Sequence, residues 1–193
     1  MPEELSTTAA LDQETPEPAQ EQVSLVVAEL FLDSHRVVGE LQHADALHRL
    51  VDVLNAIDGT FIVVHNSEMD DPHRPQEAPR RLQVIHVHRN AILFAIPRAG
   101  AGPAHRPRSF EVVEKVPVWA TIVLPGYEIT GNVYLPPDVD PIRAPLLSNN
   151  RFVPLTDATV VAVHDGGRTR EEPLVVVNLG RALLWAPQAP DPA

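Results

Sequence analysis

The sequence predicts a mainly β protein with a short helix, built from two tandem small curled-sheet or barrel-like units of order β-β-(α)-β-β-β. Two observations lead to this fold class. Short segments with alternating apolar residues are separated by Gly, Pro, Asn and Asp, a pattern typical of strands and turns. Residues in the two parts of the chain also match at a nearly constant spacing of 91 or 92 positions, which indicates an internal duplication.

The matching residues extend over the whole of each unit. They define a first repeat over residues 23–98 and a second over residues 115–188. Because two similar surfaces in one chain pack most simply as a fused homodimer would, we expect pseudo-twofold symmetry between the repeats. The matches are Ala28 with Ala120, Leu32 with Leu124, Gly39 with Gly131, Phe61 with Phe152, Leu82 with Leu174, Val84 with Val176, Arg89 with Arg181, Ala91 with Ala182, Leu93 with Leu184 and Ala95 with Ala186.

Each repeat is predicted to open with an antiparallel hairpin, closed by a tight turn. Gly39 and Gly131 hold the same place in the second strand of each hairpin, on its inward face. A missing side chain there suits a sharp bend or a close approach of another strand. The predicted strands are 23–32 with 36–42 in the first repeat, and 116–124 with 128–135 in the second.

One helix is predicted over residues 46–55, after Asp45 as its N-cap. The second repeat contains four prolines in the same region, which allow at most a turn because an internal proline breaks a helix. The apolar residues of the helix follow the i, i+3, i+4, i+7 spacing of a single apolar face: Leu47, Leu50, Val51 and Leu54.

The last part of each repeat is predicted to be a third strand followed by a closing hairpin. Gly180-Arg181 suits the tight turn of the second closing hairpin. The ranges are 60–66, then 82–88 with 91–96, in the first repeat, and 151–163, then 174–179 with 182–186, in the second.

Three further segments flank or join the repeats. Residues 1–22 combine Pro, Glu, Gln, Ser and Thr with few large apolar side chains, so we expect a disordered acidic arm. Residues 99–114 have the glycines and prolines of a linker, and residues 189–193 form a short tail. The arm contributes six of the eleven net negative charges, which leaves the body of the chain only mildly acidic.

Composition narrows the classes of function. The chain has no cysteine, which excludes disulfides, thiolate catalysis and cysteine-ligated metals. It has neither an apolar run long enough to span a membrane nor a secretory signal pattern. We therefore expect a cytoplasmic protein that has no membrane partner and no cofactor.

Histidines offer one candidate metal site. His86 and His88 are two residues apart on a predicted strand, so their side chains share one face. The sequence alignment of the repeats places Asn178 and Gly180 at these positions, and the pair is therefore not part of the repeated scaffold. We interpret both residues as hydrogen-bonded strand histidines and retain a metal-dependent enzyme as an alternative. Further histidines could join them in space: His43, His48 and His65.

Other chemical motifs are weaker. The acidic run over residues 66–72 could form an oxygen-rich loop for Ca²⁺ or Mg²⁺, but it lacks the glycine and the spacing of an EF-hand. We interpret it as a solvated loop. The chain also has no phosphate-binding loop and no nucleophile elbow.

Arginines concentrate in one region, between positions 74 and 108. Such a cluster could bind phosphate groups or an acidic partner, although the net charge of −11 weighs against nucleic acid. Alternatively these residues solubilise a loop and a linker, or they hold the acidic arm, which would then mask them. The candidate binding residues are Arg74, Arg80, Arg81, Arg89, Arg106 and Arg108.

The second repeat resembles a small, uncharacterised bacterial β-rich domain of unknown function. The resemblance covers about 70 residues and is weaker in the first repeat. It implies no catalytic residues and therefore favours a non-enzymatic module. The segments that carry it are 129–137, 147–149, 151–157 and 176–178, of which the Phe-Val-Pro-Leu-Thr-Asp run at 152–157 is the most specific.

These observations rank three functional hypotheses. The first is a non-catalytic protein-interaction or scaffold module that binds another protein, or itself, through exposed sheet edges or through the groove between the repeats. The second is a nucleotide- or RNA-binding small-barrel protein that uses the arginines of residues 74–108. The third is a metal-dependent enzyme centred on His86 and His88.

Overall fold

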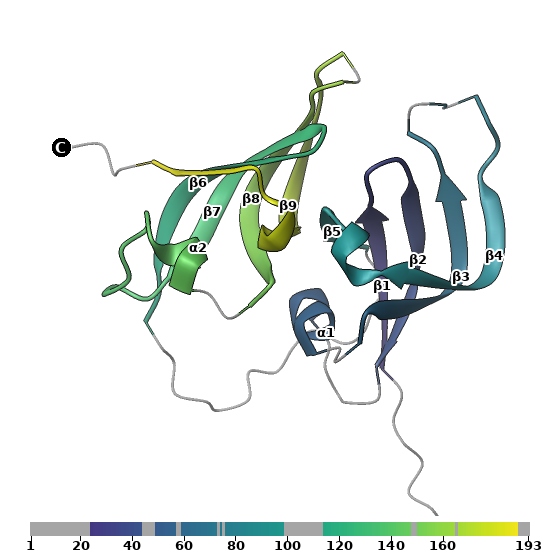
Figure 1. Ribbon diagram of the computed structural model, residues 1–193, viewed down its shortest axis with the longest axis horizontal. Helices are drawn as coiled ribbons and strands as arrows, with labels where there is room; N and C mark the ends of the chain where they lie inside the picture. The colour runs from purple at the N-terminus through teal and green to yellow at the C-terminus, as the bar shows by residue number, and fades with distance from the viewer. Residues whose placement is uncertain are drawn as a thin grey trace, which may run out of the picture.

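The computed structural model shows that the described residues form one antiparallel sheet of ten strands with little helix (Figure 1). The predicted arm (1–22) and tail (189–193) lie outside the described residues, as does all of the predicted linker (99–114) except Glu114. No helix in the described part of the chain is long and apolar enough to cross a membrane. The structure describes residues 24–43, 49–56, 59–72, 74, 76–98, 114–147, 150–164 and 166–188.

The elements of each half follow the predicted sequence of strands. The first half contains β1 (Ser24–Phe31), β2 (Arg36–His43), α1 (Leu50–Ala56), β3 (Phe61–Asp70), β4 (Arg80–His88), the 3₁₀ turn η1 (Arg89–Ala91) and β5 (Phe94–Pro97). The second half contains β6 (Val116–Leu124), β7 (Tyr127–Leu135), α2 (Ala144–Leu147), β8 (Phe152–Ala162), β9 (Arg168–Asn178), the 3₁₀ turn η2 (Leu179–Arg181) and β10 (Leu184–Pro187).

The order of the strands is β10-β6-β7-β8-β9-β5-β1-β2-β3-β4, so the sheet is open and has two free ends. Within each half the last strand pairs with the first, and the halves are joined where β5 pairs with β9. The predicted closing hairpins are therefore wrong. Because η1 and η2 intervene, β4 does not pair with β5, nor β9 with β10.

The pairing of β5 with β9, which we call the join, also differs from the expected pseudo-twofold packing. A twofold axis would bring the same strand of each half together. Here the fifth strand of the first half, β5, meets the fourth strand of the second, β9 (Figure 1). The join is therefore head-to-tail in its strand order.

The join makes the two hydrophobic cores share strands. On β5, Phe94 and Ile96 are buried in the core of the second half, whereas Ala95 is buried in the core of the first. On β9 the alternation runs the other way, since Val176 enters the core of the first half and Val177 that of the second. Each half therefore completes the core of the other, because successive strand residues face opposite sides.

Both predicted inward glycines lie at bulges where another strand comes close. The pairing of β2 with β3 shifts register between Val38 and Glu40, and that of β7 with β8 shifts between Thr130 and Asn132. A Cβ atom on Gly39 would lie 2.9 Å from the carbonyl oxygen of His65. The corresponding distance at Gly131 is also 2.9 Å, to a carbonyl oxygen of β8. The close approach therefore requires glycine at both places.

Helix α1 covers the lower end of the join. Its side chains Leu50, Val53 and Leu54 are buried in the core of the first half. Asn55 bridges to the other half, since its amide donates to the carbonyl oxygen of Phe152 at 2.8 Å and its Oδ1 accepts from the backbone N–H of Phe152 at 3.0 Å. The helix thus fixes the start of β8 against the first half.

Candidate functional site

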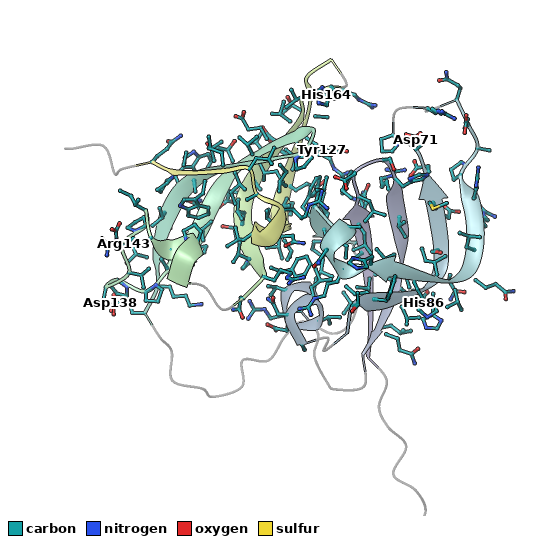
Figure 2. All side chains as sticks on the ribbon, in the orientation of Figure 1. Asp71, His86, Tyr127, Asp138, Arg143 and His164 are labelled. Carbon is teal, nitrogen blue, oxygen red and sulfur yellow. The ribbon has the colours of Figure 1, made fainter. Side chains whose placement is uncertain are left out.

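His86 and His88 lie on β4, at the open end of the sheet. His86 is exposed, and Figure 2 shows it on the lower side of the first half. The Nδ1 atom of His88 accepts from the backbone N–H of Asn90 at 3.2 Å, and its ring meets Phe61 edge-on at 5.1 Å. Among the described residues, no group of three or more His, Asp, Cys or Glu side chains is arranged to hold a metal ion.

The candidate arginines do not form one surface. Arg74 and Arg81 pair with nearby carboxylates at the far end of β4, where Arg80 is also exposed. Arg89 lies at the opposite end of the strand, next to α1, and donates to the carbonyl oxygen of Asn55 at 3.3 Å. Two of the candidates fall outside the described residues: Arg106 and Arg108.

The acidic run that we interpreted as a solvated loop is mostly the end of β3. Its carboxylates pair with arginines of neighbouring strands, Glu68 with Arg81 at 2.9 Å and Asp70 with Arg36 at 2.7 Å. Such cross-strand ion pairs stabilise the sheet. The two carboxylates therefore face arginines of different strands and do not point towards a common metal site.

A buried ionic cluster, not predicted from the sequence, lies at the join. Glu29 on β1 has a fully buried side chain and accepts hydrogen bonds from three arginines. Arg36 reaches it at 3.0 Å, Arg170 at 3.1 and 3.2 Å, and Arg98 also contacts it directly. Because Arg36 and Arg98 come from the first half and Arg170 from the second, the cluster links the two halves.

The charges of this cluster balance. Arg36 also makes a bidentate pair with Asp70, and Arg170 pairs with Glu172. Burial lowers the pKa of Arg98, the positive charge of Arg170 lowers it further, and Glu172 acts in the opposite direction. Arginine remains charged at neutral pH despite such shifts. The cluster is therefore an internal salt-bridge network that holds the halves together.

A hollow of about 530 Å³ adjoins the cluster. Arg36 and Arg170 line it, and each is already bonded to a carboxylate of the cluster. Its apolar wall includes Phe31 and Tyr127. Both rings pack against Phe94, whose ring is stacked on that of Phe31 with the ring centres 4.2 Å apart. The hollow thus continues the packing of the join.

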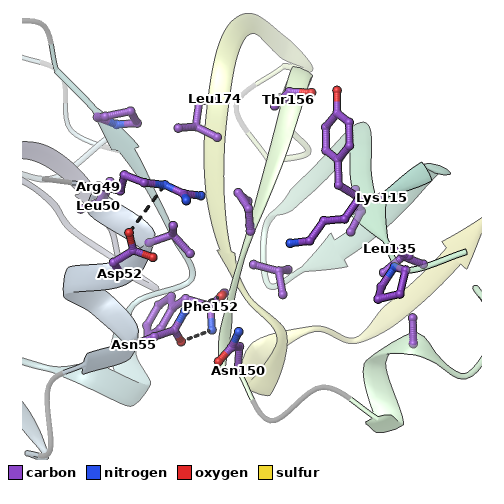
Figure 3. Close-up of a pocket in the computed structure, with 18 of the residues that line it drawn as sticks. Arg49, Leu50, Asp52, Asn55, Lys115, Leu135, Asn150, Phe152, Thr156 and Leu174 are labelled. Carbon is purple, nitrogen blue, oxygen red and sulfur yellow. Dashed lines mark hydrogen bonds and ion pairs between the residues drawn. The ribbon is translucent and has the colours of Figure 1, made fainter. Parts of the chain in front are cut away.

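A larger open groove of about 1180 Å³ separates α1 from strands β7 and β8. Figure 3 shows Arg49 and Asp52, an ion pair at 3.6 Å, on the side of α1, with Lys115 across the groove. Apolar residues such as Val133 and Leu135 form much of the remaining wall. Among its described lining residues there is neither a Ser–His pair nor a pair of carboxylates.

The two open ends of the sheet carry exposed apolar side chains. At the β4 end, Phe61 is 52 % exposed and Val84 is 50 % exposed. At the β10 end, Leu183 is 70 % exposed and Leu184 is 49 % exposed. In the described part of the chain no strand pairs with the outer side of β4 or of β10. Edges with exposed apolar side chains are typical of interaction surfaces.

Sequence reasoning named exposed edges as a class of binding surface but did not identify which strands would form them. Strand alternation is the same at an edge and in the middle of a sheet. The available signal was weak: β4 starts after Pro79 with Arg80 and Arg81, and β10 ends at Pro187. Charges and prolines at such positions are typical of edge strands.

Comparison with known proteins finds no matching family model, no matching curated protein and no matching solved structure. The resemblance of the second half to a bacterial β-rich domain therefore stays a prediction.

Proposed function

We propose that this chain is a non-catalytic, cytoplasmic protein-interaction module, built from a duplicated β unit, that binds protein strands at the two open ends of its sheet. One observation carries the proposal. Both β4 and β10 have unpaired outer edges in the described structure, and each edge is flanked by apolar side chains that are about half exposed or more. Adding a strand would satisfy the backbone groups and cover these side chains.

The duplication is supported by features that recur at the same places. Both halves have the strand order fifth-first-second-third-fourth. Asn66 and Asp157, opposite the two bulges, both have positive φ, at 47° and 51°. The 3₁₀ turns align His88 with Asn178, not with Gly180 as the sequence alignment did. Both turns are capped in the same way, since the side chains of His88 and Asn178 each accept from the backbone N–H two residues further on.

A strand peptide tests the proposal. We expect a synthetic peptide of residues 171–180, which contains most of β9, to bind the full-length protein and shift the NMR signals of β10 and its neighbour β6. Leu184→Asp should abolish these shifts, because a carboxylate would occupy the newly buried edge.

Two controls define the site of binding. A scrambled peptide should produce no shifts, and Val163→Asp, at a residue that is 54 % exposed in the turn after β8, should leave binding unchanged. Shifts confined to the groove beside α1, or no shifts at saturating peptide, would contradict the proposal.

A further inference from the structure

We infer that the partner at these edges is a second copy of the chain, with β10 of one copy pairing with β4 of the next. This inference rests on the proposed function and specifies its partner. The starting point is the join itself, which shows that a fourth strand and a fifth strand of this fold can pair. The two free edges are the other fourth strand, β4, and the other fifth strand, β10.

The contacts at the join predict the register between copies. Phe94 lies opposite Val177 and Ala95 opposite Val176, and the N–H of Asn178 donates to the carbonyl oxygen of Leu93 at 2.9 Å. Residues at the same distances from the 3₁₀ turns give the corresponding contacts between the free edges of two copies. Leu184 of one copy would lie opposite Val87 of the next, and Trp185 opposite His86. The N–H of His88 would face the carbonyl oxygen of Leu183.

The backbone of the free edges is oriented for this pairing. Arg89 donates its N–H inward to Thr60 on the β3 side at 2.8 Å. Because backbone groups alternate along a strand, the N–H groups of His86 and His88 point outward. At the other edge, the N–H of Gln188 donates inward to the carbonyl oxygen of Trp119 on β6 at 2.7 Å. Trp185 is three residues earlier, so by the same alternation its backbone N–H and carbonyl groups point outward.

The pattern of exposure supports the inference. Phe94 and Leu93, at the join, are both 0 % exposed, whereas Leu184 and Leu183, at the same distances from their 3₁₀ turn, are 49 % and 70 % exposed. Phe152 and its sequence match Phe61 differ in the same way. Phe152 is 0 % exposed beside the join, whereas Phe61 at the free end is 52 % exposed. Apolar side chains are thus uncovered where their counterparts are buried, and a second copy would cover them.

His88 also reproduces the hydrogen bonding of Asn178. The Oδ1 atom of Asn178 accepts from its 3₁₀ turn at 3.0 Å, and its Nδ2 donates across the join to the carbonyl oxygen of Ile92 at 2.8 Å. In His88 the Nδ1 atom accepts from the turn, which leaves the proton on Nε2 free to donate. Counting from the turns, its acceptor in the next copy is the carbonyl oxygen of Ala182.

Such contacts join unlike surfaces, so copies would assemble head-to-tail into a ring or an open filament. A twofold dimer, in contrast, would pair an edge with itself. The two arrangements respond differently when one edge is blocked. His86→Pro removes an outward N–H from β4 without removing a bond to β3, and Leu184→Asp places a charge on the β10 edge.

Sedimentation velocity of the full-length chain tests the inference. We expect wild type and Val163→Asp to sediment increasingly faster as concentration rises, and each edge variant alone to stay a monomer of 21.2 kDa. An equimolar mixture of the two edge variants should form a dimer of two 21.2 kDa chains and nothing larger, because one intact edge of each kind remains. Circular dichroism should show that both variants keep the wild-type β content.

Other outcomes would overturn the inference. Monomeric wild type at the highest soluble concentration would exclude self-association. Edge variants that associate as wild type does would show that the copies do not associate through β4 and β10. Edge variants that dimerise alone but not with each other would indicate a twofold interface. The proposed function would survive each of these results if the peptide of residues 171–180 still bound at β10, and would fall only if that binding was also absent.

Discussion

Glu29→Gln is expected to lower the free energy of unfolding by about 3 kcal/mol. The carboxylate of Glu29 is fully buried and holds Arg36, Arg98 and Arg170. Replacing it with a neutral amide leaves three guanidinium groups facing one another without their shared counter-ion. Because their side chains are 34 to 38 % exposed, water offsets part of the cost, which places the effect at the low end for a broken buried ion pair.

Glu68→Gln is the matched control for this change. Glu68 pairs with Arg81 at 2.9 Å, but both side chains are well exposed, at 49 % and 86 %. Surface pairs of this kind contribute less than about 1 kcal/mol. Urea unfolding of both variants provides the comparison, and a loss for Glu29→Gln no larger than that for Glu68→Gln would show that the ionic cluster does not stabilise the join.

Phe152→Ala is expected to cost about 3–5 kcal/mol. The ring of Phe152 belongs to the second half of the chain but is fully buried in the core of the first half. Truncation would leave a cavity beside α1, with no loss of the two hydrogen bonds from Asn55, which involve the backbone of Phe152. The expected loss therefore arises from packing across the join.

Phe61→Ala makes the same chemical change on a half-exposed ring and should lower the free energy of unfolding by about 1 kcal/mol or less in dilute protein.

Urea unfolding also reports on the cooperativity between the two halves. Both tryptophans, Trp119 and Trp185, lie in the second half, so their fluorescence follows that half alone, whereas circular dichroism follows both. We expect the two signals to change together, and separate transitions would show that the halves fold independently.

Local patterns predicted the local structure. Apolar segments bounded by turn residues identified all ten strands of the sheet, with boundaries that differ by up to six residues, and the i, i+3, i+4, i+7 spacing identified α1. Val37 and Leu41 show why, because both are buried on one face of β2. Gly39 and Gly131 were also informative, because close approach of two backbones excludes any side chain.

Non-local pairing was not predictable from these patterns. The segment 94–97 has the apolar character of a closing strand, but the sequence does not specify that it pairs with β1 and β9 instead of β4. Three residues of 3₁₀ turn after His88 redirect the chain. A short apolar strand is compatible with several partners, and only the assembled cores select among them.

The candidate site illustrates the same limit. The arginines are close in the sequence, but β4 has nine residues and extends roughly 30 Å, which separates Arg80 from Arg89. Glu29, in contrast, is distant in sequence from Arg98 and Arg170 but touches both. An acidic residue in an apolar strand was the only sequence signal of that cluster.

We propose that β4 and β10 are complementary edges of one interaction module. Hydrogen exchange of the wild-type protein, followed by mass spectrometry at rising protein concentration, tests it most directly. We expect amides within residues 84–88 and 183–187 to become protected together, because they contain the outward N–H groups of both edges, while α1 and the turn at Gly126 stay unchanged. Protection that appears at only one edge, or only in the groove beside α1, would show that β4 and β10 do not pair with each other.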